Sequence, residues 1–184
     1  MLPLRRERTG SHRLTDRVSQ LEQCIDALRA EKDRLQEEVS YLSEDADFGV
    51  LTRKAFLQIC RFMPRGVRVF AFLDFDRVRE LNDCLGYREV NRRIRACLSL
   101  RRRRSDLLAR WFSGDELVIL FDTTVRGARL RMRQYLLAAA SQGLSFTYEF
   151  GTWVVGAETI ESAVERAAER VLARKKRRAL GSGE

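Results

Sequence analysis

Leucine recurs every seven residues near the start of the chain, and this spacing constrains the fold more than any other feature. The repeating leucines are Leu14, Leu21, Leu28, Leu35 and Leu42. The residues that alternate with them at four-then-three spacing are Val18, Ile25, Lys32 and Val39. β-branched residues at the a positions of a heptad, with leucine at d, favour a parallel two-stranded coiled coil. We therefore expect residues 13–44 to join two copies of the chain as a homodimer.

A lone amphipathic helix lying on its own domain is the alternative for this segment. Such a helix has a wider apolar stripe than an a/d seam, and the repeat here continues unbroken from Leu14 to Leu42. Lys32 at an a position costs stability but disfavours higher oligomers and fixes the register. Arg17 at g faces Glu22 at e of the second helix, an attraction worth a few tenths of a kcal/mol, roughly. The coiled coil is the favoured interpretation.

The length of the chain, 184 residues, suits one compact domain plus this extension. No apolar run approaches the roughly 18 residues that span a bilayer. Residues 1–12 are expected to form a basic tail, and no apolar segment follows its basic residues. We therefore expect no signal peptide and a cytoplasmic location. The chain has 4 cysteines, without a CxxC pair, and 1 histidine, so we expect reduced, mostly buried thiols and no zinc site.

The formal net charge of +9 suggests an anionic partner. Nucleotide, nucleic acid and membrane surface all meet that description, and a solvated arginine-rich surface is the plain alternative. Basic clusters at 92–95, 101–104 and 174–178 would suit a nucleic-acid-binding coiled-coil protein. No DNA- or RNA-binding motif is visible, however. We therefore expect neither a membrane nor nucleic acid as the partner.

Beyond an acidic hinge at 43–49, helical and β periodicities interleave over the rest of the chain. Helices are expected at 52–63 with Thr52 as N-cap, at 77–100 with a break near Gly86, at 125–141 and at 158–178. Strands are expected at 67–75 and 144–155, with a β-hairpin over 107–121. This order predicts an α+β fold in which helices pack on a mixed sheet.

Acidic residues stand at the ends of these expected strands. Asp74 and Asp76 close a buried strand and lie on one face of it, because they are two residues apart. Asp115 and Glu116 lie at the tip of the hairpin. If the strands are neighbours, Asp74 meets Asp115 or Glu116, and such oxygen ligands suit Mg²⁺ or Mn²⁺ beside substrate phosphates. Acidic residues are also common turn formers, which is the structural alternative.

Several of these segments resemble the signatures of one family, in the same order along the chain. Residues 113–117, SGDEL, resemble the GGDEF signature. Residues 45–56, DADFGVLTRKAF, resemble the entry motif D-x-L-T-G-L-x-N-R-R-x-F, and residues 72–87 resemble L-D-I-D-x-F-K-x-I-N-D-x-x-G-H. Phe150-Gly151 stands at the place of the I-G strand, and residues 166–175 resemble the helix R-A-D-E-A-L-Y-x-A-K. Residues 45–178 are thus similar to the GGDEF (diguanylate cyclase) family, as a divergent member.

The resemblance implies a palm-like nucleotidyl cyclase domain over 45–184 that acts in bacterial signalling. Members of the family condense two GTP molecules into cyclic di-GMP with a divalent metal ion. Each domain holds half of the site, so the reaction needs a dimer. A coiled coil over 13–44 would raise the effective concentration of the second domain to the mM range, roughly.

The resemblance also implies a role for each matching residue. Asp74 and the backbone carbonyl of Phe75 would hold the metal, with Asp115 and Glu116 completing the site and favouring deprotonation of the attacking 3′-hydroxyl. The positions that would contact the nucleotide are Asn82 and Asn91 at the base, and Arg79, Ser113, Gly114 and Lys175 at the phosphates. Arg103 and Asp106 form the R-x-x-D pattern of a possible product-inhibition site, although a solvated basic helix end explains these residues as well.

The chain departs from the family pattern at several of these positions. Asn91 replaces an aspartate that reads guanine, and an amide accepts hydrogen bonds only through its oxygen, so the base preference stays open. Ser113 replaces the first glycine of the signature, and Trp111-Phe112 adds one residue before it, as a bulge or a shifted register. Two functions remain: an active cyclase, or a catalytically degenerate domain that binds nucleotide or dimerises in signalling.

Overall fold

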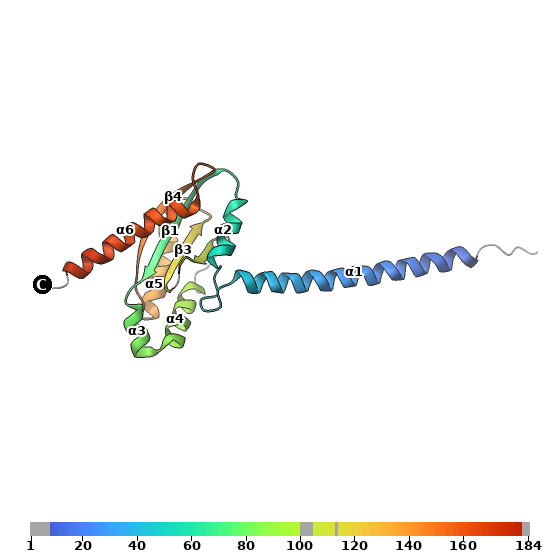
Figure 1. Ribbon diagram of the computed structural model, residues 1–184, viewed down its shortest axis with the longest axis horizontal. Coiled ribbons are helices and arrows are strands. Elements are labelled where there is room, and N and C mark those ends of the chain that lie inside the picture. Colours follow the sequence, from blue (N-terminus) through green and yellow to red (C-terminus); the bar gives the residue numbers. More distant parts are fainter. Residues whose placement is uncertain (1–7, 100–104, 113, 182–184) are drawn as a thin grey trace, which may run out of the picture. The chain divides into compact units, whose positions relative to one another are not determined.

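The computed structural model describes residues 8–99, 105–112 and 114–181 (Figure 1). The chain divides into two units, Met1–Leu42 and Ser43–Glu184. Among the described residues, no helix combines the length and the apolar character that crossing a membrane requires.

The first unit is dominated by one continuous helix, α1 (Arg8–Ser43). It begins five residues before the expected coiled coil, so residues 8–12 are helical rather than a loose tail. No proline interrupts this stretch, and Gly10 costs a helix only about 1 kcal/mol. The described a and d side chains of apolar type are all about half exposed or more: Val18 53%, Leu21 61%, Ile25 47%, Leu28 70%, Leu35 46% and Val39 62%. The side chains of Leu14 and Leu42 lie outside the described residues, and the coiled coil itself stays a prediction.

The second unit alternates helices and strands. Its elements are α2 (Arg53–Arg61), β1 (Gly66–Phe75), α3 (Val78–Leu85), α4 (Tyr87–Ser99), β2 (Leu107–Arg110), β3 (Glu116–Phe121), α5 (Val125–Ser141), β4 (Phe146–Val155) and α6 (Ile160–Gly181). Thr52 caps α2 as expected, since its Oγ1 accepts a hydrogen bond from the Ala55 amide at 3.3 Å. Gly86, at φ +80°, separates α3 from α4 at the expected break.

The four strands form one sheet in the order β2-β3-β1-β4. Every pair in it is antiparallel, so the mixed sheet expected from the sequence is corrected. Helices between strands suggested parallel crossovers, but β2 turns back into β3, and β4 joins the opposite edge antiparallel to β1. The expected hairpin is confirmed, with Arg110 opposite Leu117. Parallel pairing among described residues occurs only as isolated bridges, such as Leu51 with Ala109.

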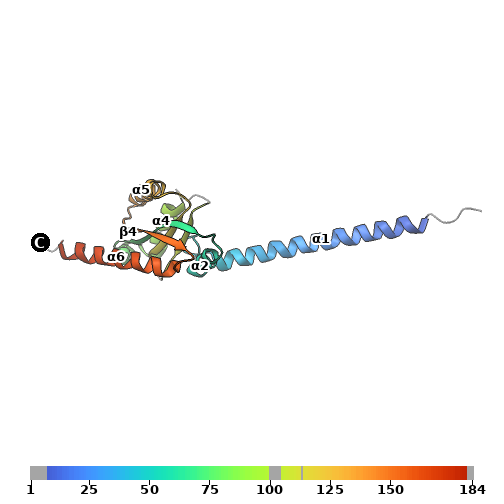
Figure 2. The same cartoon turned by 90° about the horizontal axis from the view of Figure 1, so that it is seen from above.

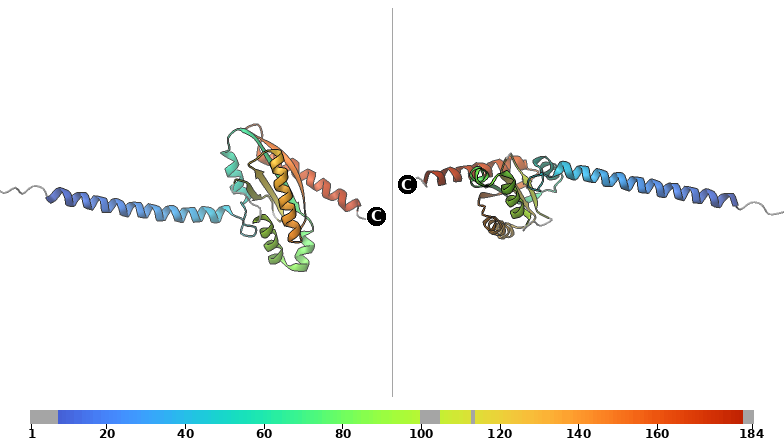
Figure 3. Two further views of the ribbon diagram at one scale, coloured as in Figure 1. Left: turned by 180° about the vertical axis from the view of Figure 1, so that it is seen from behind. Right: turned by 90° about the horizontal axis from the view of Figure 1, so that it is seen from below.

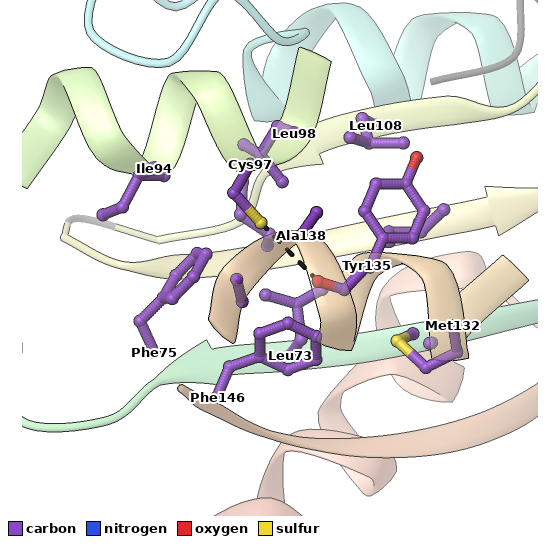
Figure 4. Packing of buried hydrophobic residues seen from close by; sticks show 14 of the residues in the cluster. Leu73, Phe75, Ile94, Cys97, Leu98, Leu108, Met132, Tyr135, Ala138 and Phe146 are labelled. Carbon is purple, nitrogen blue, oxygen red and sulfur yellow. Dashed lines mark hydrogen bonds between the residues drawn. The ribbon is translucent and has the colours of Figure 1, made fainter. Parts of the chain in front are cut away.

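Helices cover both faces of the sheet, with α5 and α6 on opposite sides of it (Figures 2 and 3). Side chains of a strand alternate between faces. On one face, Leu73 and Phe75 pack with residues of α4 and α5, where the Cys97 thiol lies 3.8 Å from the Tyr135 carbonyl oxygen (Figure 4). On the other face, Phe70 packs with residues of α2 and α6. The fold is therefore α+β, with two apolar layers that share one sheet.

Two of the four cysteines are buried in these layers. Burial raises the pKa of Cys60 and of Cys97 to about 12 in each case. Both thiols therefore stay protonated and behave as small apolar side chains. Cys24 and Cys84 are exposed and free. The expectation of reduced cysteines holds, while the expectation of burial holds for two of them.

Candidate active site at the end of the central strands

The acids expected to meet do meet, at one end of the two central strands. Asp74 lies next to the end of β1, directly opposite Glu116, the first residue of β3. By alternation Asp74 shares the face of Phe70 and Phe72, which is the α6 side of the sheet. Asp115 precedes Glu116, and its carbonyl oxygen lies 3.4 Å from the Phe75 amide that donates to it.

Lys175 of α6 lies inside this acid cluster. Its Nζ is 2.7 Å from Asp74 Oδ1 and 3.5 Å from Asp76 Oδ1. The same nitrogen donates a hydrogen bond of 2.8 Å to the backbone carbonyl of Phe75. The sequence placed Lys175 near substrate phosphates. In the structure its ammonium contacts two of the oxygens expected to hold a metal ion.

Burial and mutual repulsion raise the pKa of the two hairpin acids. For Asp115 the main cause is burial, followed by the negative charge of Asp74, and Lys175 offsets part of the shift. Burial also raises the pKa of Glu116, followed by the charges of Asp74 and Asp115. The cluster thus holds more negative charge than its lysine neutralises.

The donor set fits a hard divalent cation. Glu116 Oε2 is buried, and among the described residues it has no hydrogen-bond partner. An orphaned carboxylate oxygen beside Asp74 and the Phe75 carbonyl is a ligand arrangement suited to Mg²⁺ or Mn²⁺. No group of three His, Cys, Asp or Glu side chains in the described ranges could hold a metal alone. A metal ion here would therefore also use the carbonyl and oxygens from substrate or water.

A cavity gives solvent access to this cluster. It lies between the sheet and α6 and has a volume of about 310 Å³. Asp74 and Glu116 line it from the sheet, and Glu165 and Glu169 line it from the helix. Its floor is apolar, formed in part by Phe72. The negative lining favours the entry of cations toward Glu116.

Three of the residues expected at the nucleotide, Arg79, Asn82 and Asn91, lie on the helices α3 and α4, which contact each other. Asn82 on α3 has a buried Oδ1 that makes no hydrogen bond within the described part of the chain. Arg79, one turn earlier, is exposed, and Asn91 on α4 is half-buried. A buried amide oxygen without a partner costs free energy until a donor reaches it. Asn82 is thus ready to accept a hydrogen bond from a ligand.

The turn between β2 and β3 absorbs the extra residue of the signature. Strand register is regular up to Arg110 opposite Leu117, and the Trp111 amide still donates to the Glu116 carbonyl at 2.9 Å. No strand bulge is needed. Gly114 has φ +98°, and a Cβ there would meet nothing within 4 Å, so glycine is required for backbone conformation rather than for packing. Ser113 lies outside the described residues.

Arg110 is a structural residue of the site that sequence reasoning missed. Its Nε donates to the Gly114 carbonyl at 2.9 Å, and its Nη1 contacts Asp45 at 2.9 Å and Asp47 at 3.2 Å. The guanidinium also stacks 4.5 Å from the centre of the Phe48 ring. Arg110 therefore ties the signature turn to the entry segment. The match of Asp45 to the first position of the entry motif was the one sequence signal that pointed to this segment.

Thr147 of β4 is a second residue that sequence reasoning missed. It lies opposite Asp74 in the sheet, and its hydroxyl donates to Asp76 Oδ1 at 2.9 Å. Arg178 of α6 donates to the Thr147 hydroxyl at 3.2 Å. Only the strand register, which sequence does not fix, brings this threonine to the acids.

The possible inhibitory pair stays a prediction, because Arg103 and the rest of the 101–104 cluster lie outside the described residues. Its other member, Asp106, is buried and forms an ion pair with Arg131 of α5. Asp106 Oδ1 also accepts a hydrogen bond from the Asp122 amide at 3.1 Å. Asp106 is thus part of the interior that links the hairpin to α5.

Comparison with known proteins identifies the architecture. No protein-family model matches the chain, and no curated protein matches it. Solved structures do match. The diguanylate cyclase SiaD of Pseudomonas aeruginosa, in complex with its activator SiaC, superposes with a TM-score of 0.68 at 21% identity, over 91% of this chain and 71% of SiaD. The chain has the fold of a GGDEF domain.

Two further GGDEF structures extend this similarity. The coiled coil and GGDEF domain of DgcB from Caulobacter crescentus, in complex with c-di-GMP, gives a TM-score of 0.67 at 18% identity over 92% of this chain and 95% of DgcB. The GGDEF domain of FimX from Pseudomonas aeruginosa gives 0.61 at 16% identity over 72% of this chain and 94% of FimX. At these identities the GGDEF comparison establishes the fold, and function has to be argued from the site.

Proposed function

We propose that this protein is a metal-dependent nucleotidyl cyclase that joins two nucleoside triphosphates into a cyclic dinucleotide, with GTP as the expected substrate and cyclic di-GMP as the product. One observation carries the proposal above the others. The register of the GGDEF-type sheet sets Asp74 against Glu116, beside the Phe75 carbonyl, and leaves a buried Glu116 oxygen that has no hydrogen-bond partner in the described part of the chain. A hairpin that only needed turn-forming residues would have no reason to bury a carboxylate in this way.

In this proposal Asp74, the Phe75 carbonyl, Asp115 and Glu116 hold Mg²⁺ or Mn²⁺. The metal would supply positive charge that favours ionisation of a 3′-hydroxyl and neutralises phosphate oxygens. The 3′-oxygen forms a bond to the α-phosphorus of the second nucleotide, and the bond from that phosphorus to pyrophosphate breaks. Asp115 and Glu116, whose pKa is raised by burial and by the neighbouring acids, would accept the proton that the hydroxyl loses. Two such steps close the ring.

The remaining residues bind and orient the nucleotide. Asn82 would offer its buried Oδ1, which has no hydrogen-bond partner among the described residues, to the base, with Asn91 on the neighbouring helix. Arg79, exposed on α3, and Lys175 would neutralise phosphates of the bound nucleotide. Gly114 keeps the signature turn in its left-handed conformation. Because Asn91 is an amide, base selection is the least constrained part of the proposal.

We further propose that α1 dimerises the protein as a parallel coiled coil. The half-exposed stripe from Val18 to Val39 gives each helix an apolar seam that a second copy would bury. Tethering two domains at one end raises their effective concentration, which a reaction between two half-sites needs.

A degenerate signalling module is the second candidate. The observation that favours it is Asn91, which weakens guanine reading, together with a lysine placed among the metal ligands. Such a module would bind nucleotide or cyclic dinucleotide without turnover.

Product analysis separates the two candidates. The full chain is incubated with mixed nucleoside triphosphates and Mg²⁺ or Mn²⁺, and products are identified by mass spectrometry. A cyclic dinucleotide that disappears in Asp115→Ala supports the cyclase, and its base composition reports what Asn91 accepts. Absence of product from a folded dimer that still binds nucleotide in calorimetry would instead support the signalling module.

A further inference from the structure

We infer that Lys175 is the resident counter-cation of the acid cluster, and that a divalent metal ion can bind there only when the Lys175 ammonium leaves. The inference rests on the proposed function in one respect, namely that Asp74 and the Phe75 carbonyl are metal ligands. It assigns to Lys175, otherwise expected only to bind phosphates, a second role in regulating metal binding at this site.

The ammonium occupies the position that a metal would need. Nζ lies 2.7 Å from Asp74 Oδ1 and 2.8 Å from the Phe75 carbonyl oxygen, so it bridges the side-chain and main-chain ligands. Asp76 Oδ1 adds a third oxygen at 3.5 Å. These distances are those of hydrogen bonds and a close ion pair. Lys175 is also mostly buried, with 25% of its side chain exposed.

Two neighbouring basic residues of α6, Arg174 and Arg178, have other partners. Arg174 forms an ion pair of 2.5 Å with Glu149 and donates to the Tyr148 carbonyl, while Arg178 donates to Thr147. Within the described ranges, Lys175 is the cation that contacts Asp74. The cluster therefore depends on this one side chain for neutralisation while no metal is bound.

Coexistence of the two cations on the same oxygens is unfavourable. A metal ion about 2.1 Å from Asp74 and the Phe75 carbonyl would lie within a few ångströms of the ammonium, where like charges repel strongly. The lysine side chain is able to move away, since its four-carbon stem is flexible and its ammonium is readily hydrated, but it loses these charged hydrogen bonds when it does so. Metal affinity is thus reduced by the pairing that Lys175 must give up.

The exchange also links metal to nucleotide. Once displaced, the ammonium is free at the edge of the cluster to pair with an anionic triphosphate. Each ligand then makes binding of the other more favourable, and the linkage is reciprocal. The acid cluster would bind metal weakly without nucleotide and more tightly with it.

Mn²⁺ binding to the full chain, measured by electron paramagnetic resonance of the free ion, tests this inference. Lys175→Met is expected to tighten the Mn²⁺ dissociation constant about tenfold, because hydrogen bonds to a charged group no longer have to be broken. Lys176→Met, one residue along and exposed, is the matched control and should bind as the unmodified protein does. Lys175→Arg keeps the charge and should not tighten binding. Lys175→Gln serves if Lys175→Met does not fold.

The outcomes separate the inference from the function on which it rests. Equal Mn²⁺ affinity in the unmodified protein and in Lys175→Met, with loss of Mn²⁺ binding in Asp74→Asn, would contradict the displacement of Lys175. It would still support the metal site. No Mn²⁺ binding in any variant would overturn both. A non-hydrolysable triphosphate should tighten Mn²⁺ binding in the unmodified protein and do so less in Lys175→Met. An unchanged linkage would contradict the exchange.

Discussion

The two faces of strand β1 differ in a way that explains where the site lies. Toward α4 and α5 the strand is apolar and buried to its end, through Leu73 and Phe75. Toward α6 the apolar side chains stop at Phe72, and acids follow at Asp74 and Asp76. One strand therefore provides a closed core on one side and a charged cluster on the other. The packed side fixes the position of the acids, so the site requires no rigid loop of its own.

Substitution of Asp74 should show the difference between the two faces most strongly. Asp74→Asn should lower cyclic dinucleotide formation on the order of a thousandfold, because a metal ligand and its charge are lost. The free energy of unfolding in urea should change by less than about 1 kcal/mol, because loss of the ion pair with Lys175 is offset by weaker repulsion from Asp115 and Glu116. Asp122→Asn, on an exposed acid beyond the other end of β3, is the control and should retain activity. Equal losses in both variants would argue against the assigned site.

On the opposite face, Leu73→Ala should act on stability. Leu73 is fully buried against α4 and α5, so the truncation should lower the free energy of unfolding by about 3 kcal/mol. Urea titration measures this directly. Activity per folded molecule should fall far less than in Asp74→Asn. If the activity of Leu73→Ala fell as far as that of Asp74→Asn, the two faces of β1 would not have separate roles in stability and activity.

Arg110 connects the signature turn to the entry segment, and its replacement should have an intermediate effect. Arg110→Met removes charged hydrogen bonds to Asp45 and Gly114, which should cost about 2 kcal/mol of unfolding free energy. Arg92→Met is the matched control. Among the described residues Arg92 pairs only with Glu89, on an exposed helix surface, so its replacement should cost less than about 0.5 kcal/mol. Equal costs would show that the turn does not depend on Arg110.

Replacement of Asp115 should have the smallest effect, and it should raise the stability of the fold rather than lower it. The folded state raises the pKa of Asp115, so its charge opposes folding above that pKa, and the penalty disappears as the pH falls through it. In chelator at neutral pH, Asp115→Asn should therefore stabilise the protein by about 1 kcal/mol, or about 2–4 °C in Tm. The gain should shrink in acid. Thermal unfolding at two pH values measures it, and destabilisation at neutral pH would contradict the electrostatic account.

Much of this arrangement follows from local sequence patterns. Thr52 marks the start of α2, Gly86 the break between α3 and α4, and the two apolar runs around residues 113–115 mark the hairpin. Each of these features depends on residues close in sequence, or on the period of a strand. The meeting of Asp74 with Asp115 or Glu116 could be predicted only on the condition that the two strands are neighbours, which the pairing of β1 with β3 fulfils.

The rest depends on register and side-chain geometry over long separations. Thr147 reaches Asp76 across 71 positions, and Arg131 reaches Asp106 across 25. The R-x-x-D pattern pointed Asp106 outward, whereas its pairing with Arg131 buries it. Lys175 was placed correctly on its helix, but the contact of its ammonium with the Phe75 carbonyl depends on side-chain torsions. No short sequence pattern predicts these torsions.

The central claim is that the acidic end of β1 and β3, on the α6 face, binds the metal. Titration of the ¹⁵N-labelled protein with substoichiometric Mn²⁺, followed by amide NMR, locates the ion directly through paramagnetic broadening. The account predicts that the amides of Asp74, Phe75, Asp115 and Glu116 broaden first, and that Asp74→Asn abolishes this pattern. Broadening that begins elsewhere, or that persists unchanged in Asp74→Asn, would contradict it.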